Sequence, residues 1–185
     1  MQVLGVAPAT TLTVDLAARR LHERPTTFED WAVDGVPLRR LVADRWGVDD
    51  LPIEMSRLWP EDPSAAVASL RALLGEGPAD FEDGRGALLV CPTDQDVSCR
   101  ALGARVLIGE GTVEWRDVGW QVDVEPFVPA PDEYGPLLQF RFDRAQYERL
   151  LRQLLTAYER RGSEQAAALP EPAPERPRWC RRFLR

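Results

Sequence analysis

Alternating apolar and polar residues predict two strands in the first part of the chain. Leu12, Val14 and Leu16 occupy alternate positions, which places the three side chains on one face of a strand. A weaker strand candidate covers 28–33 and is followed by an Asp-Gly dipeptide at 34–35, which is typical of a turn. We therefore expect two short strands before the first helix.

Two helices are predicted from residues that favour helix starts and stops. The first begins at Pro37, because proline fits the first turn of a helix, and ends at Gly47. The second is capped by Asp62 and ends at Gly75. Each carries apolar residues at helical spacing, namely Leu38, Leu41 and Val42 in the first and Val67, Leu70 and Leu74 in the second.

A third helix has the clearest pattern in the chain. Asp143 and Gln146 resemble a capping box, and Phe142 and Tyr147 have the spacing of a hydrophobic staple. The apolar residues that follow repeat at helical spacing: Leu150, Leu151, Leu154, Leu155 and Tyr158. We expect this helix to run to about Arg161 and to stop at Gly162.

Further strands are predicted between the second and third helices. The short apolar run 87–91 has Gly and Pro at its ends, which favours a central strand buried on both faces. The segments 105–108 and 112–115 flank a three-residue Gly-Glu-Gly loop and predict a hairpin. Another alternating segment, 138–142, predicts the last strand.

The period of two changes within the strand that follows this loop. Val113 and Trp115 occupy odd positions, whereas Val118 and Trp120 occupy even ones. A β-bulge near 116–117 restores a single buried face. We therefore predict a bulge here, with Trp115 in the core.

The order of these elements predicts an α+β fold. Strands, two helices, a meander and a terminal helix favour a mainly antiparallel sheet with about three helices packed on it, as a single pair of layers. The length of 185 residues suits one domain, which we place at 1–162. The composition then becomes rich in Pro and Ala, so 163–185 is expected to be a linker and a basic, flexible tail.

Charge and composition exclude several classes of function. The net charge of −7 argues against nucleic-acid binding and suits a partner protein that is basic. No apolar run is long enough to span a membrane, and no signal peptide is evident, so we expect a cytoplasmic protein. The chain lacks lysine, which excludes Schiff-base and P-loop chemistry, and His22 is its one histidine, a residue more typical of a charged surface than of catalysis.

One segment combines residues that bind metals. Cys91, Asp94, Asp96 and Cys99 follow the buried strand 87–91 within a single turn. Thiolates and carboxylates can share a zinc ion, although the spacing matches no common zinc motif. An odd number of cysteines without a signal peptide indicates reduced thiols, so a thiol-dependent role is the alternative.

Aromatic residues near the predicted bulge are candidates for a partner surface. Trp120 and Phe127 lie beyond the change of period, where burial is harder to predict than for Trp115. Aromatic side chains contribute strongly to protein interfaces. We therefore name Trp120 and Phe127 as candidate partner-binding residues.

Several of these motifs resemble a family of uncharacterised actinobacterial proteins. The resemblance rests on the Leu-Leu-Val-Cys-Pro run at 88–92, on Cys99, and on a Val-x-Trp-x-Asp-x-Gly-Trp element that holds Trp115 and Trp120. It covers about two-thirds of the chain and brings no established activity. In this family the turn resembles C-x-x-C-G-D-x-x-C-G, so Asp94 here stands at the position of the middle cysteine. The resemblance therefore implies that any metal held by the family turn is held weakly here, or not at all.

Three hypotheses for function follow. The first is a non-enzymatic protein-binding module, such as an immunity-type or accessory protein, because no convergent catalytic set is evident in a small acidic chain. The second is a metal-binding or thiol-dependent protein centred on Cys91–Cys99, with no other cofactor expected and zinc as the candidate ion. The third is a small enzyme that uses acidic residues and arginines at the mouth of the sheet.

Overall fold

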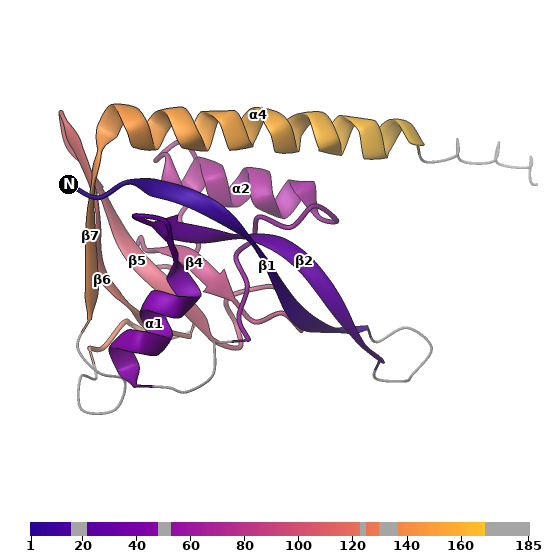
Figure 1. Ribbon diagram of the computed structural model, residues 1–185, viewed down its shortest axis with the longest axis horizontal. Helices are drawn as coiled ribbons and strands as arrows, with labels where there is room; N and C mark the ends of the chain where they lie inside the picture. The colour runs from indigo at the N-terminus through magenta and orange to yellow at the C-terminus, as the bar shows by residue number, and fades with distance from the viewer. Residues whose placement is uncertain (16–21, 48–52, 123–124, 130–136, 169–185) are drawn as a thin grey trace, which may run out of the picture.

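The computed structural model describes residues 1–15, 22–47, 53–122, 125–129 and 137–168 (Figure 1). The described part contains three helices and two antiparallel sheets, which confirms the predicted α+β class. The antiparallel strands are divided between the two sheets and do not form a single one.

The first sheet is dominated by a long hairpin. It contains β1 (Leu4–Asp15), β2 (His22–Val33) and the short β3 (Val36–Pro37), in the order β1-β2-β3. β1 and β2 pair over their full lengths, and Figure 1 shows their far ends extending away from the rest of the sheet. Asp34 and Gly35 have positive φ angles of 52° and 81°, which confirms the turn predicted there.

The predicted strand is present in β1, and the face that carries Leu12 is exposed at that residue. Leu12 is 53 % exposed, whereas Thr11 and Thr13 on either side of it are buried. The threonines can be buried because their hydroxyls are paired: Thr13 bonds to Thr26 over 2.7 Å, and Thr11 donates to the Ile53 carbonyl. The Val14 side chain and Leu16 lie outside the described residues.

Helices α1 (Leu38–Trp46) and α2 (Pro63–Leu73) begin and end near the predicted signals. Gly47 follows α1 in a left-handed conformation with a φ angle of 65°, which few other residues adopt. Asp62 caps α2 by accepting a hydrogen bond from the Ala65 amide over 3.1 Å. Both predicted caps are therefore confirmed.

The second sheet is an antiparallel meander. Its strands, in the order β4-β5-β6-β7, are β4 (Gly86–Val90), β5 (Ala101–Ile108), β6 (Thr112–Gln121) and β7 (Leu138–Asp143). All five residues of β4 are buried, as predicted. The prediction of a central strand is wrong, because β4 lies at the edge of this sheet, where the Met55 segment covers it through the bridge to Val90. The Gly109 amide donates to the Thr112 carbonyl over 2.8 Å and closes the predicted hairpin between β5 and β6.

The predicted bulge lies in β6. The pairing of β6 with β7 shifts between Trp115 and Val118, and Asp117 has a φ angle of 53°. This irregularity leaves Val113, Trp115 and Val118 all buried. The bulge therefore keeps one apolar face toward the core, as the change of period predicted.

Trp115 lies at the centre of the core. It is 0 % exposed and makes edge-on contacts with Trp31, at 5.7 Å between ring centroids, and with Phe142, at 5.2 Å. These contacts join β2 of the first sheet to β6 and β7 of the second. The prediction that Trp115 is a core residue is confirmed.

Two β-bridges join the sheets at their edges. Gln2, before β1, pairs with Phe142 of β7, and Met55 pairs with Val90 of β4. The Met55 bridge consists of two backbone hydrogen bonds, of 3.0 and 2.8 Å. The Met55 segment also contacts β2, because Leu58 accepts a hydrogen bond from the Glu29 amide over 3.0 Å.

Helix α4 (Arg144–Ala168) runs beside α2 along one side of the molecule (Figure 1). The predicted end at Gly162 is wrong, because the helix continues through it to Ala168. Gly162 faces Pro63 of α2, and a Cβ there would make ordinary contact with the proline ring at 3.7 Å. Residues 163–168, predicted as linker, are helical, and the basic tail lies outside the described residues.

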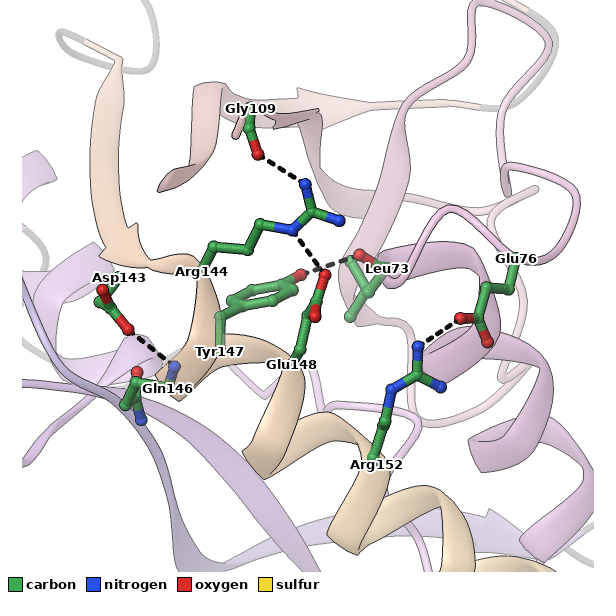
Figure 2. A network of polar contacts seen from close by, with 9 residues as sticks. All are labelled: Leu73, Glu76, Gly109, Asp143, Arg144, Gln146, Tyr147, Glu148 and Arg152. Atoms are coloured by element: carbon green, nitrogen blue, oxygen red, sulfur yellow. Dashed lines mark hydrogen bonds and ion pairs between the residues drawn. The ribbon is translucent and has the colours of Figure 1, made fainter. Parts of the chain in front are cut away.

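The start of α4 is held by polar contacts with several elements (Figure 2). Asp143 accepts from the Gln146 amide over 2.9 Å, which confirms half of the predicted capping box. The other half of the box would require the Gln146 side chain, which instead donates to the Leu4 carbonyl of β1 over 2.7 Å. Phe142 and Tyr147 stack at 5.8 Å, as the predicted staple requires. Arg144 reaches the Gly109 carbonyl over 2.8 Å.

Candidate metal-binding site

The turn between β4 and β5 carries the cysteines that the sequence analysis singled out. It begins at Cys91, whose carbonyl accepts a hydrogen bond from the Gln95 amide over 2.8 Å. Gln95 has a φ angle of 59°, a left-handed conformation that reverses the chain. This reversal brings Cys99 back toward Cys91 before β5 begins.

Apolar contacts anchor the turn to the sheet. Val97 is buried in a small cluster beside the main core, which also contains Phe81, Ala87, Val90 and Ala101. Pro92 is buried as well, whereas Asp94 and Cys99 are exposed. The polar side chains of the turn are therefore presented outward on a base that is packed against β4 and β5.

Three of the four predicted ligands come together. The sulfur atoms of Cys91 and Cys99 and a carboxylate oxygen of Asp94 all lie within 4.8 Å of one another. Cys91 is half-buried, so the group opens toward solvent on the side of Asp94 and Cys99. Two sulfurs on one tetrahedral zinc ion lie about 3.8 Å apart, given Zn–S bonds of about 2.3 Å. The three donor atoms, all within 4.8 Å of one another, are therefore close enough to share one zinc ion.

Asp96, the fourth predicted ligand, lies outside this group of three. Its carboxylate accepts hydrogen bonds from the Ser98 amide over 2.9 Å and from the Ser98 hydroxyl over 2.7 Å. These bonds hold the pKa of Asp96 below its usual value. Asp96 therefore stabilises the segment that positions Cys99.

Neighbouring groups influence the protonation of the Cys99 thiol. A hydrogen bond with Cys91 and the charge of Cys91 raise the pKa of the Cys99 thiol, and Asp94 adds to the effect. Clustered negative groups disfavour each further ionisation. A bound cation reverses this balance, because a thiol that coordinates a metal ion is deprotonated.

The two predicted partner-binding aromatics do not share a surface. Gly119 faces Phe127, since a Cβ there would lie 2.9 Å from that ring, and the adjacent Trp120 points to the other face of β6. Both rings are half-buried and make intramolecular contacts: Trp120 with Trp46 at 5.8 Å and Phe127 with the Arg85 guanidinium at 3.6 Å. Partner binding through Trp120 and Phe127 stays a prediction.

A buried carboxylate that was not predicted from the sequence caps the start of α1. Asp30 on β2 is 1 % exposed, and its carboxylate accepts a hydrogen bond from the Arg39 amide in the first turn of the helix, over 3.3 Å. Pro37 precedes this turn and supplies no side-chain cap, so a residue from another element does so. Burial raises the pKa of Asp30 to about 7, against the opposing effects of the Arg39 amide and charge. The sequence did contain a signal for this burial: Asp30 shares one face of a strand with the apolar residues Phe28 and Ala32.

Two arginines, Arg39 and Arg100, contact buried groups. Arg39 is buried, lies over the Phe28 ring at 5.4 Å and donates to the Thr10 carbonyl over 3.2 Å. Arg100 pairs with the buried Glu54 and lies over the Trp120 ring at 4.5 Å. The enzyme hypothesis requires acidic residues and arginines of this kind, but these contacts do not indicate a particular reaction.

Arg85 is a second feature that the sequence did not reveal. Its side chain is 0 % exposed, and its Nη2 donates to the carbonyls of Gly103, over 2.8 Å, and Asp117, over 2.7 Å. It therefore links β5 to the bulge of β6. Burial lowers the pKa of Arg85 to about 10, although nearby Asp83 and Asp117 oppose the shift. An arginine in the sequence Asp-Gly-Arg-Gly resembles an exposed loop residue, which is why no pattern indicated its burial.

Comparison with known proteins adds no family to this description. No protein-family model, no curated protein and no solved structure matches the chain. The resemblance to the actinobacterial family stays a prediction, as does a cytoplasmic location. Within the described ranges, no helix is both long enough and apolar enough to cross a membrane. The His22 side chain lies outside the described residues, so its role is also untested.

Proposed function

We propose that the protein binds one thiophilic divalent metal ion, with zinc as the preferred ion, through Cys91, Asp94 and Cys99. The observation that carries this proposal is the approach of two sulfurs and a carboxylate oxygen to within 4.8 Å of one another. With three protein ligands, a tetrahedral ion keeps one position for water or another ligand. The exposure of Asp94 and Cys99 supports an open position that faces solvent.

The chemistry of the donors supports zinc over other common ions. Thiolates are soft ligands that favour zinc, whereas magnesium and calcium require shells made of oxygen atoms. Two thiolates and one carboxylate also compensate the charge of a divalent ion. Asp94 is a harder ligand than a third thiolate, so the affinity is expected to lie below that of sites built from cysteines.

Binding of an ion would also connect the two ends of the turn. The turn is already anchored by buried Val97 and by the bonds between Asp96 and Ser98. Coordination would add a link between Cys91, at the end of β4, and Cys99, just before β5. A metal ion that binds only the folded protein stabilises it by mass action, so zinc should raise the unfolding temperature.

Titration of the full-length, tag-free, reduced protein tests the proposal. We expect one equivalent of zinc in competition with a chromophoric chelator, and sulfur-to-metal charge-transfer bands when cobalt(II) replaces zinc. Cys91→Ser and Cys99→Ser should each weaken binding at least 10-fold. Asp94→Cys should tighten it, because a third thiolate replaces the carboxylate.

Two variants control for effects outside the three-residue group. Asp96→Asn removes the neighbouring negative charge but keeps an oxygen that can accept the hydrogen bonds from Ser98, and Cys180→Ser removes the remaining cysteine. Both should bind zinc with an affinity within about 3-fold of the unmodified protein, a difference of less than about 0.7 kcal/mol. A stoichiometry near zero, or affinity that survives both Cys91→Ser and Cys99→Ser, would overturn the proposal.

A further inference from the structure

The two thiols of the turn are arranged for a reaction with each other. Their sulfur atoms lie within 4.8 Å of each other, although Cys99 follows Cys91 by eight positions in the chain. A disulfide requires a sulfur separation of about 2.05 Å and Cβ atoms about 3.5–4.5 Å apart. Because Cys99 is exposed, rotation of its side chain with a small movement of the turn can close the remaining distance.

The fold has already brought the ends of this loop together. The Gln95 amide bonds to the Cys91 carbonyl, and Asp96 holds Ser98 beside Cys99. The entropic cost of closing the loop is therefore met by folding and not by bond formation. This favours a disulfide within the turn over one with a distant cysteine.

We propose that Cys91 and Cys99 form a reversible intramolecular disulfide under oxidising conditions, and that this disulfide switches off metal binding at the turn. Formation of the bond stands on the geometry of the two thiols alone. Its effect on metal binding rests on the function proposed above.

The exposures of the two residues set the order of the steps. The Cys99 thiolate, which is exposed, attacks one sulfur of a small disulfide such as oxidised glutathione and releases one glutathione thiolate. The half-buried Cys91 thiolate then attacks the Cys99 sulfur of this mixed disulfide and releases the second glutathione. In total, the protein thiols lose two protons and two electrons, and the oxidant is reduced to two molecules of glutathione.

Metal binding and oxidation compete for the same sulfur atoms. A metal ion is held by thiolates, and a disulfide has none to offer. Oxidation therefore releases the ion and leaves Asp94 as one exposed carboxylate of the former site. Conversely, a bound ion occupies both sulfur atoms and should slow their oxidation.

The test uses full-length, metal-free protein equilibrated in glutathione buffers of increasing oxidised fraction. After acid quenching, intact mass spectrometry should detect the loss of two hydrogen atoms, and proteolysis should recover a linked Cys91–Cys99 peptide. Dithiothreitol should restore the original mass. Cys180→Ser should behave in the same way, whereas Cys91→Ser should accumulate glutathione on Cys99, because the resolving thiol is absent.

Separate outcomes identify which of the two proposals fails. A pair that stays reduced in excess oxidised glutathione, or that links only to Cys180, would overturn the disulfide, whatever the affinity for zinc. If the disulfide forms but the reduced protein binds no zinc, the redox chemistry stands and the metal function is wrong. If the oxidised protein binds zinc as tightly as the reduced protein, the proposed switch is wrong even though both events occur.

Discussion

The indole nitrogen of Trp115 donates a hydrogen bond to the hydroxyl of Tyr147 over 3.2 Å, in the centre of the core. The same hydroxyl donates to the Leu73 carbonyl at the end of α2 over 3.0 Å, as Figure 2 shows. One buried hydroxyl therefore connects β6, α2 and α4. Each of the three polar groups would otherwise be buried without a partner, so this relay determines how α4 is seated.

Removal of the Tyr147 hydroxyl should be costly for its size. In Tyr147→Phe the ring stays, but the Trp115 nitrogen and the Leu73 carbonyl lose their partner. We expect the free energy of unfolding to fall by about 2–4 kcal/mol, because each unsatisfied buried group costs about 1–3. Urea unfolding followed by tryptophan fluorescence measures this. Tyr158→Phe is the matched control: among the described residues its hydroxyl bonds to Glu29 alone, and its loss should cost about 1 kcal/mol.

Truncation of Trp115 tests the position of the core. Trp115→Ala removes a ring that contacts Trp31, Phe140, Phe142 and Tyr147. We expect a loss of about 3–5 kcal/mol in the free energy of unfolding, measured by urea or thermal denaturation. Trp120→Ala, at a half-buried position, should cost less. Equal effects of the two substitutions would contradict the placement of Trp115 between the sheets.

The ionisation of Asp30 should make stability fall as the pH rises. The pKa of Asp30 is about 7 in the folded protein, but an unfolded aspartate has a pKa of about 3.9. Between these values the unfolded chain releases its proton while the folded protein keeps it. The free energy of unfolding therefore decreases from about pH 4 to about pH 7, by at most about 4 kcal/mol from this group, and is then constant.

The comparison with Asp30→Asn isolates this effect from the other ionisable groups. The amide oxygen can still accept from the Arg39 amide, but the side chain no longer titrates. Relative to the unmodified protein, the variant should gain stability between pH 4 and pH 7 in urea unfolding. A difference between the two proteins that does not change with pH would show that Asp30 is ionised normally in the fold.

Gly119 should not tolerate a side chain. A Cβ at this position would lie 2.9 Å from the Phe127 ring and 3.0 Å from Leu137, so Gly119→Ala must displace the segment that covers β6. Overpacking of this kind costs about 1–3 kcal/mol, measurable as a lower urea midpoint. Gly111→Ala is the control, because open space surrounds Gly111 and its effect should stay within about 0.5 kcal/mol.

The proposed metal site should bind zinc more tightly as the pH rises. Neighbouring Cys91 and Asp94 raise the pKa of the Cys99 thiol, and a thiol must lose its proton to coordinate a metal ion. With two thiol ligands, the logarithm of the apparent association constant should therefore increase by up to about two per pH unit, measured by chelator competition from pH 6 to 8. Cys91→Ser should reduce this slope to about one. A slope of zero in the unmodified protein would exclude thiolate ligands.

Patterns along the chain predicted most of the secondary structure. The caps at Asp62 and Asp143, the left-handed stop at Gly47 and the bulge before Val118 each depend on a few neighbouring residues. Their conformational preferences and hydrogen bonds act within one or two turns or along one strand. The alternation of apolar and polar residues likewise predicted that Trp115 lies in the core. Such features can be predicted because the residues that cause them are adjacent in the sequence.

Features that depend on distant segments escaped prediction. Thr13 can be buried because its hydroxyl pairs with Thr26 across the hairpin, and Arg85 can be buried because it donates to the carbonyls of Gly103 and Asp117. Asp30 caps a helix that begins several residues later. In each case the energy comes from a partner on another element, which local periodicity does not reveal.

The same distinction between local and long-range causes applies to the candidate site. The sequence by itself placed two cysteines and two aspartates in one turn after a buried strand, and it determined the donor types available to a metal ion. Only the tertiary structure decided that Asp94 joins the sulfur atoms while Asp96 bonds to Ser98. The reason is physical: the left-handed residue Gln95 and the burial of Val97 set the path of the turn, and the path determines which side chains can meet.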